Sequence, residues 1–214
     1  YGFEIQHLDV KTAFVHSPID EEIFMSQPQG YEEHDAQGQL LYCKLKKTIY
    51  GLKQAGRNWN RLLSDHFISM GFTKSEADCC LFTYNRDGKR AWLTVWVDDI
   101  LVFGDTYVVD DFIVQISKKV NIGSSEKLEW FLGMRVHQTT DSIELDQETY
   151  IEKLLEKFGM KGCNPVSTPG MEKQSITDPT RLKGSESEEV KDYDYRGVVG
   201  ALLHISRFTR PDIC

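Results

Sequence analysis

Two adjacent aspartates interrupt a strongly apolar stretch of this chain. Residues 93–104 read LTVWVDDILVFG, with Asp98 and Asp99 at the centre of a run that otherwise suits a buried strand. Successive side chains of a straight strand point to opposite faces of its sheet. The two carboxylates can therefore share one site only if the chain turns back between them and the flanking strands. We predict a hairpin with Asp98 and Asp99 at its tip.

An ordinary solvent-exposed turn is the alternative explanation of these aspartates. Asp-Asp lacks the glycine that two-residue hairpin turns usually contain, which favours a functional reason. Asp9 ends a second strand-like stretch, FEIQHLD, and would lie beside Asp98 if that strand neighboured the hairpin. Crowded carboxylates repel one another unless cations neutralise them, and Mg²⁺ prefers oxygen ligands. The pattern predicts a two-metal site suited to in-line phosphoryl transfer.

The charge of the chain is unevenly distributed. The net charge is −8, and this value taken alone argues against a nucleic-acid-binding protein. Residues 40–61, however, contain six basic side chains, no acidic one and three interleaved aromatic rings. Such a run is either a solvated surface or a local positive field that attracts phosphates.

The cysteines argue against a zinc site and a disulfide framework. There are five, an odd number, and no C-x-x-C pair occurs. Cys79 and Cys80 are adjacent, which is a poor start for a zinc knuckle, so a reducing environment is the simpler prediction. No apolar run approaches the roughly 18 residues of a membrane span. Because no initiator Met or signal peptide precedes the first strand, we expect the chain to be a segment of a longer polypeptide.

Apolar periodicity and turn residues predict an α+β fold. Apolar residues recur near a 3.6 period from Leu52 and end at Gly71, which predicts a helix, and Asp87-Gly88 predicts a tight hairpin. Further predicted elements are an acidic excursion at 18–38, a returning strand at 40–45, a helix at 107–120, a hairpin at 127–145, a helix capped by Asp146 and ended by Gly159, and a helix at 193–207. The order strand, helix, strand, strand, helix, strand is that of a ferredoxin-like sheet, which hosts many unrelated activities.

Several motifs, taken in order, resemble the reverse transcriptase of copia-type LTR retrotransposons. They are LDVKTAF, KLKKTIYGLKQAGRNW, WVDDI, FLGMRV, YIEKLLEKFGMKGCNPVSTP and YRGVVGALLHISRFTRPDI. The resemblance implies an RNA-directed DNA polymerase, a nucleotidyltransferase that copies RNA or DNA into DNA from a primer. It also implies a ferredoxin-like polymerase palm with partial fingers over residues 1–160, including an excursion at about 16–50. A linker at 161–191 and a thumb- or connection-like region at 192–214, leading toward an RNase H domain, would follow.

The resemblance assigns roles only where positions match. Asp9, Asp98 and Asp99 match the catalytic, metal-binding carboxylates, and Val10 matches a position whose backbone carbonyl contacts a metal. Nucleotide binding is implied for the backbone N–H groups of Thr12 and Ala13, for Phe14 as a gate against the ribose 2′-hydroxyl, and for Gln54. Nucleic-acid contacts are implied for Lys53, Arg57, Trp96, Phe131, Leu132 and Gly133. Without the resemblance, Phe14 reads as a core residue and residues 131–133 as a plain hairpin.

Cofactors and partners follow from the same resemblance. It implies two Mg²⁺ ions, with Mn²⁺ as a substitute, deoxynucleoside triphosphates, and an RNA or DNA template with its primer. It further implies the rest of a Pol polyprotein, including integrase and RNase H, no membrane, and a location in cytoplasmic virus-like particles or in the nucleus.

The chain also departs from the family pattern. Trp96 stands where the family usually has Tyr, Gly56 stands where Pro is common, and VHSPID replaces an Asn-Gly-containing turn. We expect the 214-residue segment alone to be weak or inactive as a polymerase. Two alternatives stay open: a catalytically decayed domain with only a nucleic-acid-binding or structural role, and a two-metal nuclease or phosphatase on a similar sheet.

Overall fold

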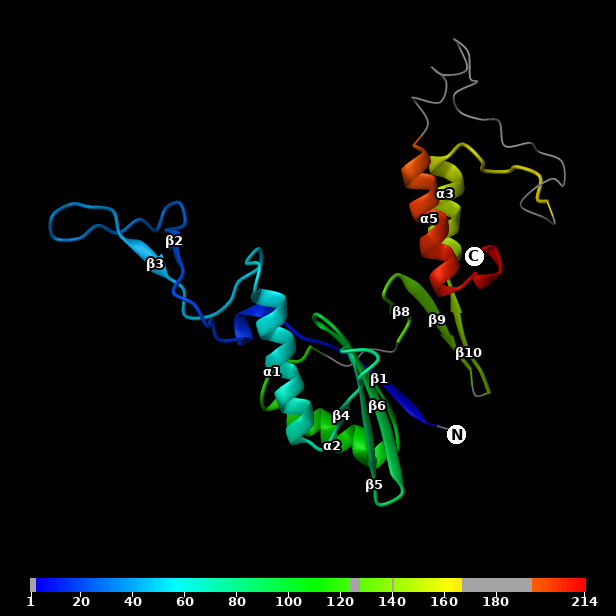
Figure 1. Cartoon of the computed structure of the whole chain (residues 1–214), viewed down its shortest axis with the longest axis horizontal. Helices are drawn as coiled ribbons and strands as arrows, with labels where there is room; N and C mark the ends of the chain where they lie inside the picture. Colours follow the sequence, from blue (N-terminus) through cyan, green and yellow to red (C-terminus); the bar gives the residue numbers. More distant parts are fainter. Residues whose placement is uncertain (1–2, 124–127, 140, 167–193) are drawn as a thin grey trace, which may run out of the picture. The chain divides into compact units, whose positions relative to one another are not determined.

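The computed structural model describes residues 3–123, 128–139, 141–166 and 194–214 (Figure 1). The chain forms two compact units, Tyr1–Leu128 and Glu129–Cys214, and each is described by itself. The domain boundaries expected at residues 160 and 191 stay predictions, and most of the expected linker lies outside the described residues. Among the residues that are described, no helix combines the length and apolarity needed to cross a bilayer.

A five-stranded antiparallel sheet is the centre of the first unit. Its strand order is β1-β7-β6-β5-β4. The strands are β1 (Glu4–Asp9), β4 (Thr73–Lys74), β5 (Leu81–Arg86), β6 (Lys89–Trp96) and β7 (Asp99–Gly104). The predicted pairing of the first strand with the central hairpin is confirmed, because β1 pairs with β7 along its whole length.

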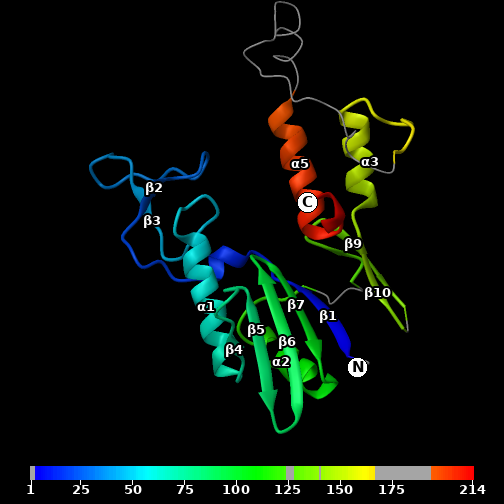
Figure 2. The same cartoon turned by 45° about the vertical axis from the view of Figure 1, so that its right-hand side comes forward.

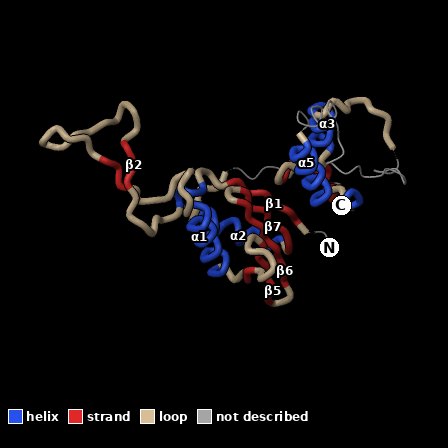
Figure 3. Tube along the Cα trace, turned by 45° about the horizontal axis from the view of Figure 1, so that its top comes forward, coloured by secondary structure: helices blue, strands red, loops and turns tan. Residues whose placement is uncertain are grey.

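Two helices cover one face of this sheet. α1 (Ala55–Ser69) and α2 (Thr106–Ser117) lie on the same side of the strands (Figures 2 and 3). Phe67 of α1 packs edge-on against Phe82 of β5 at 5.1 Å between ring centroids, and also against Phe112 of α2 at 5.6 Å. Alternate residues of a strand share a face. The residues of β6 and β7 that enter this core are almost completely buried, and they are Ala91, Leu93, Val95, Ile100 and Val102.

The uncovered face of the sheet carries a row of half-buried aromatic rings. Trp92 of β6 stacks on Phe103 of β7 with 5.7 Å between centroids, and Phe3 lies 5.5 Å from Trp92. The same face, followed toward the far end of the strands, carries Asp9 and Asp99.

Local sequence signals determine where several elements end. α1 ends at Ser69, and Gly71 follows with φ of +96°, a left-handed conformation that glycine adopts without a Cβ clash. The helix begins at Ala55, so the predicted start at Leu52 was three residues early. The Asp87-Gly88 hairpin is confirmed, since both residues have the positive φ of a type I′ turn.

The acidic excursion leaves the main sheet, as predicted. The 3-10 turn η1 (Ala13–His16) precedes it, and β2 (Phe24–Ser26) within it pairs with β3 (Tyr42–Lys44), which follows it, in a separate two-stranded ribbon. The predicted returning strand therefore exists, but it pairs with β2 instead of returning to the five-stranded sheet.

The described residues of the second unit form a small sheet and two helices. The sheet order is β10-β9-β8, from β8 (Trp130–Phe131), β9 (Met134–Gln138) and β10 (Ile143–Asp146). The helices are α3 (Glu148–Lys157) and α5 (Tyr195–Phe208), and a 3-10 turn, η3 (Pro211–Ile213), follows. Asp146 accepts a hydrogen bond from the backbone N–H of Glu148, although Gln147 occupies the cap position itself.

The expected ferredoxin-like sheet is therefore wrong in one respect. Its last strand was predicted near residues 127–138, but β8 and β9 pair with each other and with β10, outside the five-stranded sheet. The short hairpins at both ends of β9 satisfy its backbone hydrogen bonds locally. The chain is a mixed α/β protein with antiparallel sheets.

Candidate active site

The hairpin that carries the adjacent aspartates turns one residue earlier than predicted. Trp96 pairs with Asp99, so Val97 and Asp98 form the two-residue turn and Asp99 begins β7. Val97 has φ of +54°, which is rare for a β-branched residue. Such strain costs roughly 1–3 kcal/mol and clusters at functional sites. The turn is therefore held in place by its surroundings.

The register of the sheet brings three carboxylate residues to one end. Asp9 is directly opposite Asp99 across the β1–β7 ladder, and Asp98 precedes Asp99 in the turn. Asp9 and Asp99 share the uncovered face, because their neighbours Leu8 and Ile100 point into the core and are at most 1% exposed. Residues 90 positions apart in the chain thus meet, as expected, although the partner of Asp9 is Asp99 and not Asp98.

Three backbone hydrogen bonds fix the chain around Asp9. The N–H of Val10 donates to the carbonyl of Asp98 at 2.8 Å, and the N–H of Gly123 donates to the carbonyl of Asp9 at 2.7 Å. The N–H of Lys11 donates to the carbonyl of Asn121 at 2.9 Å. In the described part of the chain, no backbone N–H donates to the Val10 carbonyl, and Val10 itself is only 2% exposed.

His7 contacts Asp99, a role that the sequence analysis did not assign to it. Its Nε2 lies 2.9 Å from Oδ1 of Asp99, and both side chains are partly buried. His7 and Asp9 are two residues apart on one strand, so they share a face. That spacing was the available signal, because any side chain two positions before Asp9 must flank the same site.

Trp59 of α1 holds the strained turn through a hydrogen bond. Its indole Nε1–H donates to the Val97 carbonyl at 2.6 Å, and the side chain is only 2% exposed. Sequence reasoning assigned Trp59 to the apolar face of the helix and missed this contact. A tryptophan in a helix core usually needs a partner for its N–H, but the sequence does not say which carbonyl supplies it.

A pocket of about 170 Å³ lies between α1 and the turn. Phe14, Trp96 and Val97 all line it, together with Gly56 of α1. The structure thus brings together two predicted site residues, Phe14 and Trp96. Phe14 is half-buried with its ring edge-on to Tyr50 at 4.6 Å, so it is neither a pure core residue nor a free side chain.

The remaining predicted nucleotide-binding residues lie at the ends of neighbouring elements. Thr12 is exposed with φ of +55°, and Ala13 is buried at the start of η1. No acceptor among the described residues takes the backbone N–H of either one. Gln54 occupies the N-cap position of α1, and its side chain makes no capping hydrogen bond.

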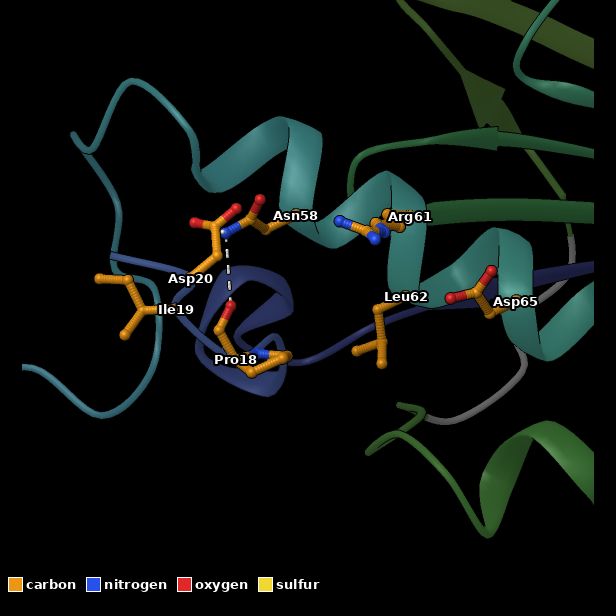
Figure 4. A pocket seen from close by; sticks show the side chains of 7 residues that line it. All are labelled: Pro18, Ile19, Asp20, Asn58, Arg61, Leu62 and Asp65. Atoms are coloured by element: carbon orange, nitrogen blue, oxygen red, sulfur yellow. Dashed lines mark hydrogen bonds between the residues drawn. The ribbon is translucent and has the colours of Figure 1, made fainter. Parts of the chain in front are cut away.

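The two predicted basic contacts lie at the start of α1. Lys53, just before the helix, is exposed, and Arg57, also exposed, reaches Asp20 of the excursion at 3.5 Å. A pocket of about 160 Å³ lies at this junction. Figure 4 shows the Asn58 amide beside Asp20, donating to the Pro18 carbonyl. The hydrogen bond from Asn58 holds the pKa of the Asp20 carboxyl below its usual value. The excursion is tied to α1 by these contacts.

Phe131, Leu132 and Gly133 belong to the second unit, where they form the end of β8 and the following turn. Leu132 and Gly133 both have positive φ, as a type I′ hairpin turn requires. The hairpin expected from the sequence is therefore confirmed, and its contact with a primer stays a prediction.

The donor set of the first site suits a hard cation. Asp9, Asp98, Asp99 and the Val10 carbonyl offer only oxygen ligands, which Mg²⁺ prefers. Asp9 is exposed and the two hairpin aspartates are half-buried, so their oxygens can be reached from solvent. The three carboxylates are not gathered within 4.8 Å of one another; within the described residues, only Asp78, Cys79 and Cys80 form a group of three that close.

Comparisons with known proteins point to one family. The model of the reverse transcriptase (RNA-dependent DNA polymerase) family matches residues 1–172. The chain is 34% identical over 99% of its length to the Retrovirus-related Pol polyprotein from transposon RE2 of Arabidopsis thaliana, of which it spans 14%. It is 35% identical over 98% of its length to the corresponding polyprotein from transposon TNT 1-94 of Nicotiana tabacum, of which it spans 16%.

A shorter relative is found in yeast. The putative transposon Ty5-1 protein YCL074W of Saccharomyces cerevisiae is 29% identical over 96% of this chain, which spans 65% of that protein. The order of the motifs, the sheet end that carries the three aspartates and these matches all point to the same family. The chain belongs to the reverse transcriptase (RNA-dependent DNA polymerase) family, and the relatives it resembles are Pol polyproteins of retrotransposons.

Proposed function

We propose that this chain is the polymerase part of a retrotransposon reverse transcriptase and adds deoxynucleotides to a primer by two-metal phosphoryl transfer. The single observation that carries the proposal is the register of β1 against β7, which sets Asp9 opposite Asp99 while Asp98 occupies the adjoining turn. A strained turn beside three accessible carboxylates serves no purpose in packing. It suits a site where cations and a triphosphate neutralise the crowded charge.

Asp9, Asp98, Asp99 and the carbonyl of Val10 would hold the metal ions. Two Mg²⁺ ions, when bound, neutralise developing charge on the attacking and leaving oxygens of an in-line displacement. His7 would hold one oxygen of the Asp99 carboxylate through its 2.9 Å contact and leave the other for a metal ion. Trp59 and the Val10–Asp98 hydrogen bond keep the turn at a constant distance from β1. Positioning of this kind supplies most of the catalysis in phosphoryl transfer.

The nucleotide would lie beside η1 and the start of α1. The backbone N–H groups of Thr12 and Ala13 have no described acceptor and would meet phosphate oxygens. Thr12 is exposed, whereas Ala13 is buried, so its N–H would be reached only after a local shift of η1. Phe14 would close the space beside the sugar, and Gln54 would line the pocket from the N-terminus of α1. The ring of Phe14 is held by Tyr50, which makes it a rigid wall.

Template and primer would contact exposed side chains. Lys53 and Arg57 offer positive charge to backbone phosphates, and Trp96, 58% exposed, offers a ring on which a base can stack. The turn at residues 131–133 would contact the primer end. We propose that the protein acts within a Pol polyprotein, in virus-like particles of the cytoplasm or in the nucleus.

Primer extension with deoxynucleotides and Mg²⁺, on matched RNA and DNA templates, tests this proposal. We expect weak but template-directed extension by this chain on both. Hydrolysis of nucleic acid without incorporation would instead indicate a two-metal nuclease. A folded chain that binds template–primer and Mn²⁺ but incorporates nothing would indicate a domain with only a binding role.

Replacement of Phe14 by alanine should relax selection of the sugar. Removing the ring opens space where a ribose 2′-hydroxyl would otherwise clash. We expect the ratio of ribonucleotide to deoxynucleotide incorporation to rise about tenfold or more, since a steric difference of 1.4 kcal/mol corresponds to one order of magnitude. Competitive single-nucleotide incorporation measures the ratio. Phe14→Tyr keeps the bulk and is the control; an unchanged ratio in Phe14→Ala would contradict the assigned role.

A further inference from the structure

The loop that enters β5 gathers two thiols and a carboxylate away from the polymerase carboxylates. The ligand atoms of Asp78, Cys79 and Cys80 all lie within 4.8 Å of one another. The two sulfurs are 3.9 Å apart. Both cysteines are free thiols, and Cys79 is exposed to solvent. Sequence reasoning set this pair aside, because adjacent cysteines do not have the spacing of a zinc knuckle.

Hydrogen bonds within the loop fix its shape before any ligand binds. Oγ of Ser75 accepts from the backbone N–H groups of Ala77 and Asp78 at 3.2 and 3.4 Å. Oδ1 of Asp78 accepts from the N–H of Cys80 at 2.8 Å, and the Asp78 carbonyl accepts from Leu81. Among the described residues, none donates to the other carboxylate oxygen of Asp78. One oxygen therefore builds the loop and the second stays available.

The distance between the two sulfurs matches that between two thiolate ligands of one tetrahedral metal ion. Two thiolates at about 2.3 Å from a Zn²⁺ ion and 3.9 Å from each other subtend about 116° at the metal, close to the tetrahedral value. Thiolates are soft ligands that select zinc-like ions, whereas Mg²⁺ takes oxygen ligands. The two sites of this chain therefore differ in the class of ion that they accept.

We propose that Cys79, Cys80 and Asp78 bind one zinc-class divalent cation, with solvent completing its coordination. This site is independent of the polymerase assignment, because none of its ligands belongs to the polymerase carboxylates. Binding releases a proton from each thiol, so that two thiolates and one carboxylate face a doubly charged ion. Burial and the neighbouring Cys79 thiol raise the pKa of Cys80, and the ion displaces the proton that Cys80 holds.

The position of the site connects it to the strand that leads into the catalytic turn. The Cys80 carbonyl accepts from the N–H of Val95 at 3.0 Å. Cys80 also lines the pocket that Trp96 and Val97 line from the other side. A single hydrogen bond therefore links a cation-binding loop at residues 78–80 to β6. A bound cation would restrict the motion of Cys80, which forms part of the pocket wall.

Titration with Cd²⁺ in excess Mg²⁺ tests the proposal on the whole chain, kept reduced by a non-thiol reductant. Thiolate-to-cadmium charge-transfer absorbance reports sulfur ligation directly, and we expect one ion per chain. Cys79→Ser and Cys80→Ser should each weaken Cd²⁺ binding at least about tenfold, as loss of a ligand does. Asp78→Asn should weaken it less, because the amide oxygen can still accept from Cys80 and preserve the loop. Zn²⁺ should displace the bound Cd²⁺ and remove the absorbance.

Cys43→Ser and Cys163→Ser are the matched controls, and we expect both to bind Cd²⁺ as the unaltered chain does. Circular dichroism and thermal unfolding confirm that each serine variant folds. Unchanged charge-transfer absorbance in folded Cys79→Ser and Cys80→Ser would overturn the proposal. So would one ion per two chains with a matching dimer in sedimentation, since the ligands would then come from different molecules.

Discussion

Asp98→Asn should abolish primer extension while leaving the fold intact. The substitution keeps the size of the side chain and removes the negative charge from a turn where the described residues give the carboxylate no protein partner. A metal ligand contributes several kcal/mol to the transition state, so we expect a loss of at least about a hundredfold, at 1.36 kcal/mol per factor of ten. Mn²⁺ binding, followed by electron paramagnetic resonance, should weaken in parallel. Asp9→Asn should behave in the same way.

Asp87→Asn is the matched control for this experiment. Asp87 is likewise an aspartate in a two-residue hairpin turn, at the opposite end of β6, and it is exposed. It has φ of +51°, which asparagine tolerates. We expect its extension rate and Mn²⁺ affinity to equal those of the unaltered chain. Equal extension by Asp98→Asn and Asp87→Asn would exclude the assigned catalytic role.

Trp59→Phe should lower both stability and the rate of extension. Phenylalanine keeps most of the buried ring but leaves the Val97 carbonyl without its 2.6 Å donor. Because Val97 is 37% exposed, water can partly replace the donor, and we expect the loss of one net hydrogen bond, roughly 0.5–1.5 kcal/mol. Because the same bond holds a residue at φ of +54°, the turn should relax and carry Asp98 away from Asp9. Small displacements of reacting groups are costly in rate, and we expect extension to fall between about tenfold and a hundredfold.

Trp92→Phe distinguishes this effect from the general loss of an indole. Trp92 lies on the uncovered face of β6, stacks on Phe103, and its Nε1 makes no hydrogen bond among the described residues. We expect a small change in its denaturant midpoint and an unchanged extension rate. If Trp59→Phe loses stability without losing rate per folded molecule, Trp59 is a core residue and does not position the turn.

Hairpins and helix ends of this chain could be predicted because short segments specify them. Asp87-Gly88 supplies two residues that accept positive φ, so the turn follows from local chemistry alone. Gly71 ends α1 for the same reason. The catalytic turn is different, because Val97 is among the residues least suited to positive φ. We predicted the turn one residue later because both carboxylates were expected to share a site, and the register of β6 against β7 together with Trp59 places it at Val97-Asp98.

Local sequence patterns also could not predict which sheet a strand joins. Residues 127–138 read as one strand, and two short strands, β8 and β9, form there, but the pattern of side chains does not say which sheet receives them. The closing hairpins at Leu132-Gly133 and before β10 give β9 two adjacent partners in sequence. Short-range pairing costs less loop-closure entropy than a return to the first sheet, and it prevailed.

The sequence by itself determined that three aspartates, Phe14, Gln54 and a basic helix occur in the order of a reverse transcriptase. It also determined an α+β chain with its main hairpins, because periodicity and turn residues act over a few positions. Only the tertiary structure decided that Asp9 faces Asp99, that His7 contacts that carboxylate and that Trp59 holds Val97. These contacts join residues 38 to 92 positions apart, and their partners follow from strand register and packing, which no local pattern encodes.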